Sequence, residues 1–346
     1  MLSMVAFLRL FVYCLWACVI LPPLTHAEVF AHFRPLIVLD NQADSRNLQH
    51  EQILTGARRF NQEYGHGFAV LDVQQLDDTA MQTVEAYLRV GYSPVLFTGC
   101  RLRPLLEKLA PLYPHIKFGL FNAVVQAPNV QSVLFKDQEA SFLIGILAGL
   151  TSKNQRLGIV GYTASKTNSN IGCGFAQGVA YVAPQAQVIS VQATNTERGS
   201  ISEPALLYQV QALTQAGTDV VFALAGQHTQ EVLKALAQAN IWSIAGPVNW
   251  NAASDFMLTS FIKRLDLATW RFLYQTYHTD WQAGQVALGV ADKVLAWAHD
   301  QHNALLLSEP MLDALQSAQL QVITGELVIQ DVRTLESCPV PIKTLP

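Results

Sequence analysis

The stretch Asp219-Val220-Val221-Phe222-Ala223-Leu224 is apolar at every position after its first residue, so both faces of a strand formed here would be apolar. Strands of this kind occur where helices cover both sides of a parallel sheet. Segments with the apolar period of a helix flank it, at 204–216 before it and at 230–239 after it. The stretch therefore predicts a buried strand in a parallel α/β sheet.

The same alternation of short apolar runs and longer helical segments continues in both directions along the chain. Before residue 135 it predicts strands at 35–40, 67–73, 94–98, 116–121 and 132–135, with helices at 49–64, 79–90 and 102–112. Beyond it, the pattern predicts strands at 156–162, 187–191, 219–223 and 242–248, and two further helices at 138–152 and 170–182.

Two such units of similar size, with no low-complexity linker between them, predict two doubly wound parallel-sheet lobes joined by crossing strands. We expect residues 28–134 plus about 252–284 to form the N-terminal lobe. Residues 135–251 plus about 285–346 are expected to form the C-terminal lobe. Ligands of open α/β sheets bind at the carboxyl ends of the strands, so the cleft between the lobes is the expected binding site.

The first 27 residues have the pattern of a secretory signal peptide. Arg9 precedes an apolar run that is short for a membrane span, and Thr25-His26-Ala27 offers a small-residue cleavage site. Cleavage there would leave a mature chain that starts at Glu28. A lipoprotein box that ends in Cys18 is the alternative, although Trp16 fits it poorly. Both alternatives export the protein, and we expect it in the periplasm.

The charge balance of the sequence limits the kinds of partner that the protein is expected to bind. The 22 lysines and arginines nearly balance the 26 aspartates and glutamates, and no basic cluster stands out, so nucleic acid and anionic membranes are not expected partners.

Beyond the signal, Cys100, Cys173 and Cys338 are too few and too widely spaced for a disulfide framework. One bridge is possible in an oxidising compartment, but the spacing does not say which two would pair.

Motifs that carry catalysis, cofactors or metals are absent from the sequence. There is no G-x-S-x-G elbow, phosphate-binding loop or H-E-x-x-H. The glycines at Gly172, Gly174 and Gly178 lie about ten residues beyond the preceding predicted strand, too far for a dinucleotide loop. His299 and His302 have no third metal ligand nearby. We therefore expect neither an enzyme nor a bound cofactor or metal.

Several segments of the chain carry recognisable motifs in a fixed order. The stretch 135–149, FKDQEASFLIGILAG, supplies nearly all of the pattern F-K-x-x-E-x-S-F-L-x-G-x-L-A-G. Further motifs follow at 157–161 (LGIVG), 174–179 (GFAQGV), 217–226 (GTDVVFALAG), 259–266 (TSFIKRLD) and 323–329 (ITGELVI). With these motifs, the chain resembles the basic membrane protein family of solute-binding proteins over about residues 114–329, and the resemblance is weak before that.

This resemblance implies a type I periplasmic-binding fold that holds a small molecule without transforming it. Characterised members bind purine nucleosides for uptake through an ABC transporter, so a membrane permease is the implied partner and a monomer is expected. A periplasmic sensory subunit that reports its ligand to a membrane receptor is the alternative.

The family pattern also nominates ligand-binding residues, of which Lys263 lies inside an intact motif. A lysine there offers three hydrogen-bond donors to a hydroxyl or carbonyl, although a salt bridge with Asp266 would also explain it. Gly226 matches a glycine where backbone approaches the ligand closely, or it is an ordinary turn glycine. Asn122 and Asn249 stand near positions where relatives carry an acidic residue, which puts a nucleoside ligand in question.

Two further positions depend on local context. Trp250 could stack on a planar ligand in place of an aromatic residue that this chain lacks near 192–200, or it could pack in the core. The N-terminal signature of the family best matches Asp44, Ser45 and Asn47, which could equally form a helix cap. Counting back from Gly56 places the same signature on Leu48-Gln49-His50 instead, so both registers stay open.

Overall fold

The computed structural model describes residues 33–41, 48–163, 166–191, 196–197, 200–335 and 337–345. The predicted signal peptide at 1–27 and the candidate residues Asp44, Ser45 and Asn47 lie outside these residues. The chain divides into residues 1–33 and a compact unit at 34–346, and the fold described here is that of the second unit.

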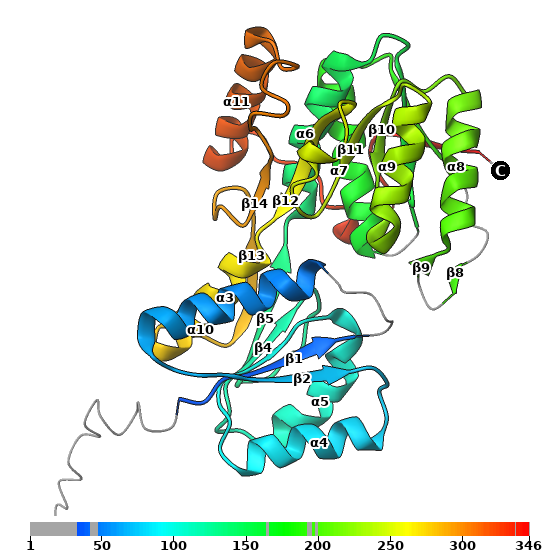
Figure 1. The fold of residues 1–346 in the computed structure, drawn as a ribbon. Helices are drawn as coiled ribbons and strands as arrows, with labels where there is room; N and C mark the ends of the chain where they lie inside the picture. Colours follow the sequence, from blue (N-terminus) through cyan, green and yellow to red (C-terminus); the bar gives the residue numbers. More distant parts are fainter. Residues whose placement is uncertain are drawn as a thin grey trace, which may run out of the picture. The chain divides into compact units, whose positions relative to one another are not determined.

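The first of two large sheets has six strands, all paired in parallel, in the order β13-β5-β4-β3-β1-β2 (Figure 1). The strands span Leu36–Asp40 (β1), Ala69–Val73 (β2), Val95–Phe97 (β3), Phe118–Phe121 (β4), Val130–Phe135 (β5) and Gly284–Leu288 (β13). The helices of this part are α3 (Leu48–Tyr64), α4 (Asp78–Arg89), α5 (Arg103–Leu112) and α10 (Leu265–Tyr277).

The second sheet has seven strands in the order β14-β12-β11-β10-β6-β7-β15, and only the β12–β14 pair is antiparallel. Its strands are β6 (Arg156–Val160), β7 (Gln187–Val191), β10 (Val220–Ala223), β11 (Trp242–Ala245), β12 (Met257–Lys263), β14 (Leu295–Trp297) and β15 (Ile342–Leu345). The helices are α6 (Asp137–Thr151), α7 (Lys166–Val182), α8 (Glu203–Gln215), α9 (Thr229–Gln238) and α11 (Glu309–Thr324), and a small hairpin pairs β8 (Thr196–Glu197) with β9 (Ser200–Ile201).

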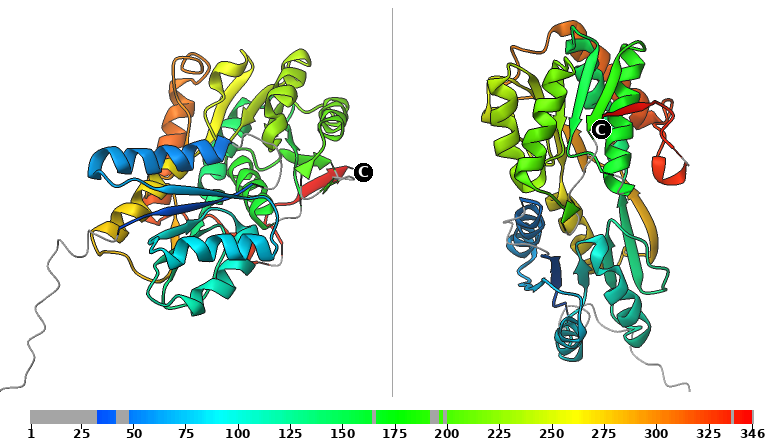
Figure 2. Two further views of the ribbon diagram at one scale, coloured as in Figure 1. Left: turned by 60° about the horizontal axis from the view of Figure 1, so that its bottom comes forward. Right: turned by 90° about the vertical axis from the view of Figure 1, so that its right-hand side faces the viewer.

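Both sheets repeat one strand order, which identifies the doubly wound architecture. Counted from its own first strand, each sheet runs 2-1-3-4-5, as β2-β1-β3-β4-β5 and as β7-β6-β10-β11-β12. Helices lie on both faces of each sheet (Figures 1 and 2), and β10 is completely buried over its four residues. The predicted fold class of two parallel α/β sheets is confirmed.

Strand pairing differs from the predicted segmentation at the second connection between the two parts. Residues 257–263 were expected in the N-terminal lobe, but β12 pairs in parallel with β11 of the second sheet. The chain returns to the first sheet only after Lys263, where α10 packs on α3, and β13 continues in that sheet to Leu288. β12 is buried at six of its seven positions, as expected of a strand inside the sheet rather than of an exposed crossing segment.

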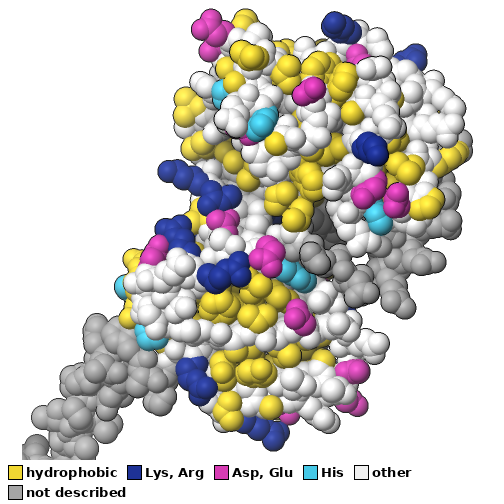
Figure 3. Space-filling model, viewed as in Figure 1, with side chains coloured by type: hydrophobic (Ala, Val, Ile, Leu, Met, Phe, Trp, Pro, Cys, Tyr) yellow, Lys and Arg dark blue, Asp and Glu magenta, His cyan; other side chains and the backbone are white. Residues whose placement is uncertain are grey.

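Helices α6 and α7 of the second part pack at very short range, and glycines make this possible. A Cβ added at Gly178 would lie 2.0 Å from the carbonyl oxygen of Phe142, and one added at Gly145 would lie 2.3 Å from that of Phe175. Cys173 of α7 also forms a disulfide with Cys338 of the C-terminal segment. None of the helices among the described residues combines the length and the apolar composition of a membrane span. On the face of the molecule drawn in Figure 3, lysine and arginine side chains are scattered among acidic and apolar ones and do not gather into one basic patch.

Candidate functional site

A cavity of about 370 Å³ lies where carboxyl ends of strands from both sheets meet. Residues that follow β1, β3 and β4 of the first sheet line it, and so do residues that follow or end β10, β11 and β12 of the second. This is the place at which open α/β sheets bind ligands. The lining residues are Asp40, Gln49, His50, Ile53, Thr98, Gly99, Cys100 and Asn122, together with Ile171, Leu224, Gly226, Gly246, Pro247, Phe261 and Lys263.

Lys263 ends β12 and brings the two parts of the chain together at this cavity. Its Nζ lies 3.0 Å from the Oδ1 of Asp137 and donates a 3.3 Å hydrogen bond to the Oδ1 of Asn122. The ammonium also lies 4.1 Å from the ring centre of Phe135. The expected alternative partner, Asp266, instead pairs with Arg264, so Lys263 is held at the cavity by buried groups.

Asn122 and Gly226, two further candidates, also line the cavity. Asn122 follows β4 with φ of 64°, a left-handed conformation that asparagine tolerates better than most residues. Gly226 follows β10 with φ of 56°, and an added Cβ there would meet no atom within 4 Å. Glycine is therefore favoured at 226 by backbone conformation rather than by lack of space.

Asn249 and Trp250 are not among the residues that line this cavity, and the position of Trp250 agrees with the alternative expectation that it packs in the core. The amide of Asn249 donates a 2.7 Å hydrogen bond to Asp300, and the backbone N–H of Trp250 donates to the hydroxyl of Ser260. The Trp250 ring packs against the buried core of the second sheet. The reason is a shorter strand: β11 ends at Ala245 rather than at 248, so residues 246 and 247 occupy the strand end that lines the cavity.

Asp40 is a lining residue that the sequence motifs did not nominate. It ends β1, and its Oδ1 lies 2.6 Å from the guanidinium of Arg101. The neighbouring Gly99 leaves room for that carboxylate, since an added Cβ would lie 2.3 Å from its Oδ2. The sequence signal that could have identified these residues is their location at the carboxyl ends of predicted strands, because Asp40 ends one predicted strand and Gly99 follows another.

His50 and Gln49 line the cavity as well, which is what the second register of the N-terminal signature would place there. The His50 Nε2 lies 3.1 Å from the backbone oxygen of Asp40. Burial lowers the pKa of His50, and this effect outweighs the opposing hydrogen bond and nearby carboxylates. The imidazole is therefore neutral at pH 7.

Comparisons with known proteins agree with this geometry. Residues 49–331 match the model of the Bmp family, described as ABC transporter substrate-binding protein PnrA-like. The chain is 24% identical over 263 residues to the CD4+ T-cell-stimulating antigen of Listeria innocua, covering 70% of this chain and 72% of that one. It is 21% identical to basic membrane protein C of Borreliella burgdorferi, covering 67% of each.

Solved structures show the same fold. A solute-binding protein of an ABC transporter system from Aeropyrum pernix K1 superposes with a TM-score of 0.70 at 21% identity, over 86% of this chain and 94% of that chain. A transcriptional activator of the comK gene from Bacillus halodurans gives 0.73 at 14% identity, over 86% of this chain and all of that chain (100%). The family match spans most of the sequence and both sheets, and the chain therefore belongs to the Bmp family of ABC transporter substrate-binding proteins.

Proposed function

We propose that this chain is the exported solute-binding protein of an ABC-type uptake system and holds a nucleoside-like or other small polar solute in the cavity around Lys263. The observation that carries the proposal is the convergence of Lys263 from the second sheet and Asn122 from the first on one cavity. A solute that contacts both would favour the arrangement in which the two parts are together, and that arrangement would dock on a permease.

The polar groups around the cavity suit a solute rich in hydroxyl or amide groups. Lys263 has three N–H donors, of which the ion pair and the Asn122 contact use two. Asp40 offers carboxylate oxygens, and Phe261, Ile53 and Leu224 offer apolar surface. A lining that is mostly apolar, with a few fixed polar groups, is typical of small-molecule sites.

A thermal-shift screen of nucleosides, bases, sugars and amino acids with the purified mature protein identifies the chemical class of the ligand. A ligand that binds only the folded state raises its melting temperature. For the ligand found, Lys263→Ala should weaken binding about tenfold or more, the worth of one charge-assisted hydrogen bond. Lys136→Ala is the matched control, because Lys136 is also ion-paired but does not line the cavity. Equal affinity of Lys263→Ala and wild type would remove Lys263 from the site.

We further propose export through the signal peptide at 1–27, with lipidation at Cys18 as the second possibility. The disulfide between Cys173 and Cys338 supports this, because such bonds persist in oxidising compartments and are rare in the cytosol. The mass of the protein purified from detergent-solubilised cell envelopes together with the periplasmic fraction decides between the two. A chain beginning at Glu28 supports cleavage after Ala27, and a lipid-modified chain beginning at Cys18 supports the alternative.

A periplasmic sensory role is a second candidate, since one relative, of Bacillus subtilis, is named as the transcriptional activator protein med. It is 24% identical to this chain over 194 residues. Deletion of the gene that encodes this protein decides between uptake and sensing. Loss of solute accumulation in the deletion strain supports uptake. Loss of a transcriptional response to the solute, with accumulation intact, supports sensing.

A further inference from the structure

Two lining side chains among the described residues are charged at neutral pH, and they come from opposite sides of the cavity. Asp40 ends β1 of the first sheet, and Lys263 ends β12 of the second. His50 also lines the cavity but is neutral, because burial lowers its pKa. The charge that a solute meets on the described wall is therefore set by these two groups and by whatever neutralises them.

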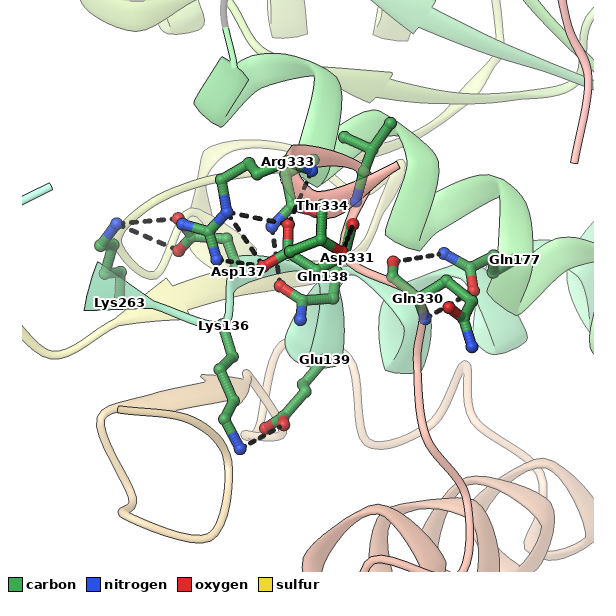
Figure 4. Close-up of polar contacts among 12 residues, drawn as sticks. Lys136, Asp137, Gln138, Glu139, Gln177, Lys263, Gln330, Asp331, Arg333 and Thr334 are labelled. Carbon is green, nitrogen blue, oxygen red and sulfur yellow. Dashed lines mark hydrogen bonds and ion pairs between the residues drawn. The ribbon is translucent and has the colours of Figure 1, made fainter. Parts of the chain in front are cut away.

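Each of the two charges is neutralised from behind by a residue that does not line the cavity. Arg101 lies 2.6 Å from Asp40 and is held in place by a 2.8 Å hydrogen bond to the backbone oxygen of Val73. Asp137 lies 3.0 Å from Lys263, and the two side chains are only 2% and 7% exposed. Figure 4 shows both carboxylate oxygens of Asp137 directed at the Lys263 ammonium.

Asp137 stays available to Lys263 because the other nearby cation has a carboxylate of its own. Arg333 of the C-terminal segment lies close to Asp137 in Figure 4, but its guanidinium forms three hydrogen bonds to Asp331. The segment is fixed in turn by two side chains of α7: the Asn170 oxygen accepts a hydrogen bond from the backbone N–H of Val332, and Gln177 both donates to and accepts from the backbone of Gln330. The cluster thus holds two cations and two anions.

Along the described wall, an ionic solute would meet no unpaired opposing charge to compensate its lost hydration. Desolvating an ion without a partner is costly, and a carboxylate or phosphate beside Lys263 would also face the negative charge of Asp137. An uncharged solute loses less hydration and can still accept a hydrogen bond from Lys263 or donate one to Asp40. Paired charges therefore offer strong hydrogen bonds while rejecting ions.

We propose that Asp137 is a specificity-determining residue, which neutralises Lys263 so that the described wall of the cavity admits uncharged solutes rich in hydroxyl or amide groups and excludes anions. The proposal rests on the proposed solute-binding function and adds to it the charge class of the solute. It assigns a role in specificity to a side chain that does not itself line the cavity.

The first experiment measures binding of inorganic phosphate by calorimetry at constant ionic strength, so it needs no knowledge of the natural solute. Wild type should show no binding. Asp137→Asn keeps the shape of the side chain but removes its charge. Its dissociation constant for phosphate should be at least about tenfold lower than the weakest one that the calorimeter can measure. Asp137→Asn/Lys263→Met should lose this binding. Phosphate binding by wild type that Lys263→Met abolishes would overturn the proposal, as would a folded Asp137→Asn protein that gains none.

The second experiment uses wild type alone, so it does not depend on the folding of any variant. Adenosine 5′-carboxamide and adenosine 5′-carboxylate have nearly the same shape and differ in charge. We expect the carboxamide to bind at least about tenfold more tightly. A carboxylate that binds equally well or better would overturn the proposal. Absence of binding by both would count against the nucleoside-like solute of the proposed function, whereas the phosphate experiment still decides the charge class.

Discussion

Replacing Lys263 by Met should destabilise the ligand-free protein, because it leaves the buried carboxylate of Asp137 without its cation. Removing one partner of a buried ion pair typically costs about 3–5 kcal/mol of unfolding free energy. The pair here is 2% and 7% exposed, so solvent screens it little. We expect about 3 kcal/mol, the lower end of that range, because Arg333 remains within electrostatic reach of Asp137.

The pKa of Arg333 supports this choice of magnitude. Burial lowers that pKa, but the hydrogen bonds and charge of Asp331, together with the charge of Asp137, raise it further than burial lowers it. Arg333 therefore interacts favourably with Asp137 and would compensate part of its charge once Lys263 is gone. The compensation is partial because the guanidinium is already bound to Asp331.

The double variant Lys263→Met/Asp137→Asn tests whether the loss comes from the unpaired charge. With neither charge present, the protein should recover more than half of the loss, a coupling of about 2 kcal/mol between two side chains in contact. Urea unfolding, followed by tryptophan fluorescence and circular dichroism, gives the midpoints and slopes needed. Arg103→Met is the control, because its pair with Glu107 is 55% and 43% exposed and should contribute less than about 1 kcal/mol. Losses that simply add in the double variant would refute the reasoning.

Three further substitutions test other parts of the structure. Cys338→Ser removes the disulfide to Cys173, which links residues 165 positions apart, and should lower the free energy of unfolding by about 2–5 kcal/mol. Adding a reductant should abolish the difference between this variant and wild type. An unchanged urea midpoint would contradict the disulfide. Gly178→Ala forces apart α6 and α7, where the added Cβ would lie 2.0 Å from a carbonyl oxygen, and should lower stability by about 1–3 kcal/mol in thermal unfolding. Gly99→Ala displaces the carboxylate of Asp40 and should weaken solute binding about tenfold in calorimetry, whereas unchanged affinity would exclude Asp40 from the site.

The architecture could be predicted because burial on both faces of a strand leaves a local signal. Inner strands such as β3, β4 and β10 are buried at every position and are therefore short apolar runs, and the intervening helices carry their own period. The prediction for residues 219–223 therefore differs from β10 by a single residue. Pairing between strands leaves a weaker signal. Nothing within 257–263 says that Thr259 will lie beside Ile244, so that strand was assigned to the wrong part of the chain.

The Cys173–Cys338 bridge shows the same limit for side chains. Spacing left three possible pairs open, because a disulfide requires two Cα atoms about 6 Å apart, and the fold alone brings them there. In the structure that separation is 5.6 Å. Cys100 follows β3 at the cavity and remains a free thiol.

Prediction of the site depended on where each strand stops. Asn122 and Gly226, which were predicted to bind the ligand, line the cavity because the strands before them end close to the predicted positions. Asn249 was nominated on a strand drawn three residues too long, and the true end turns it toward Asp300, 51 residues further along the chain. The position of Asp137 beside Lys263 was also hidden, since 126 residues separate the two. A motif match identifies the side chain that faces a solute, whereas the charge that this side chain presents depends on partners which only the tertiary structure supplies.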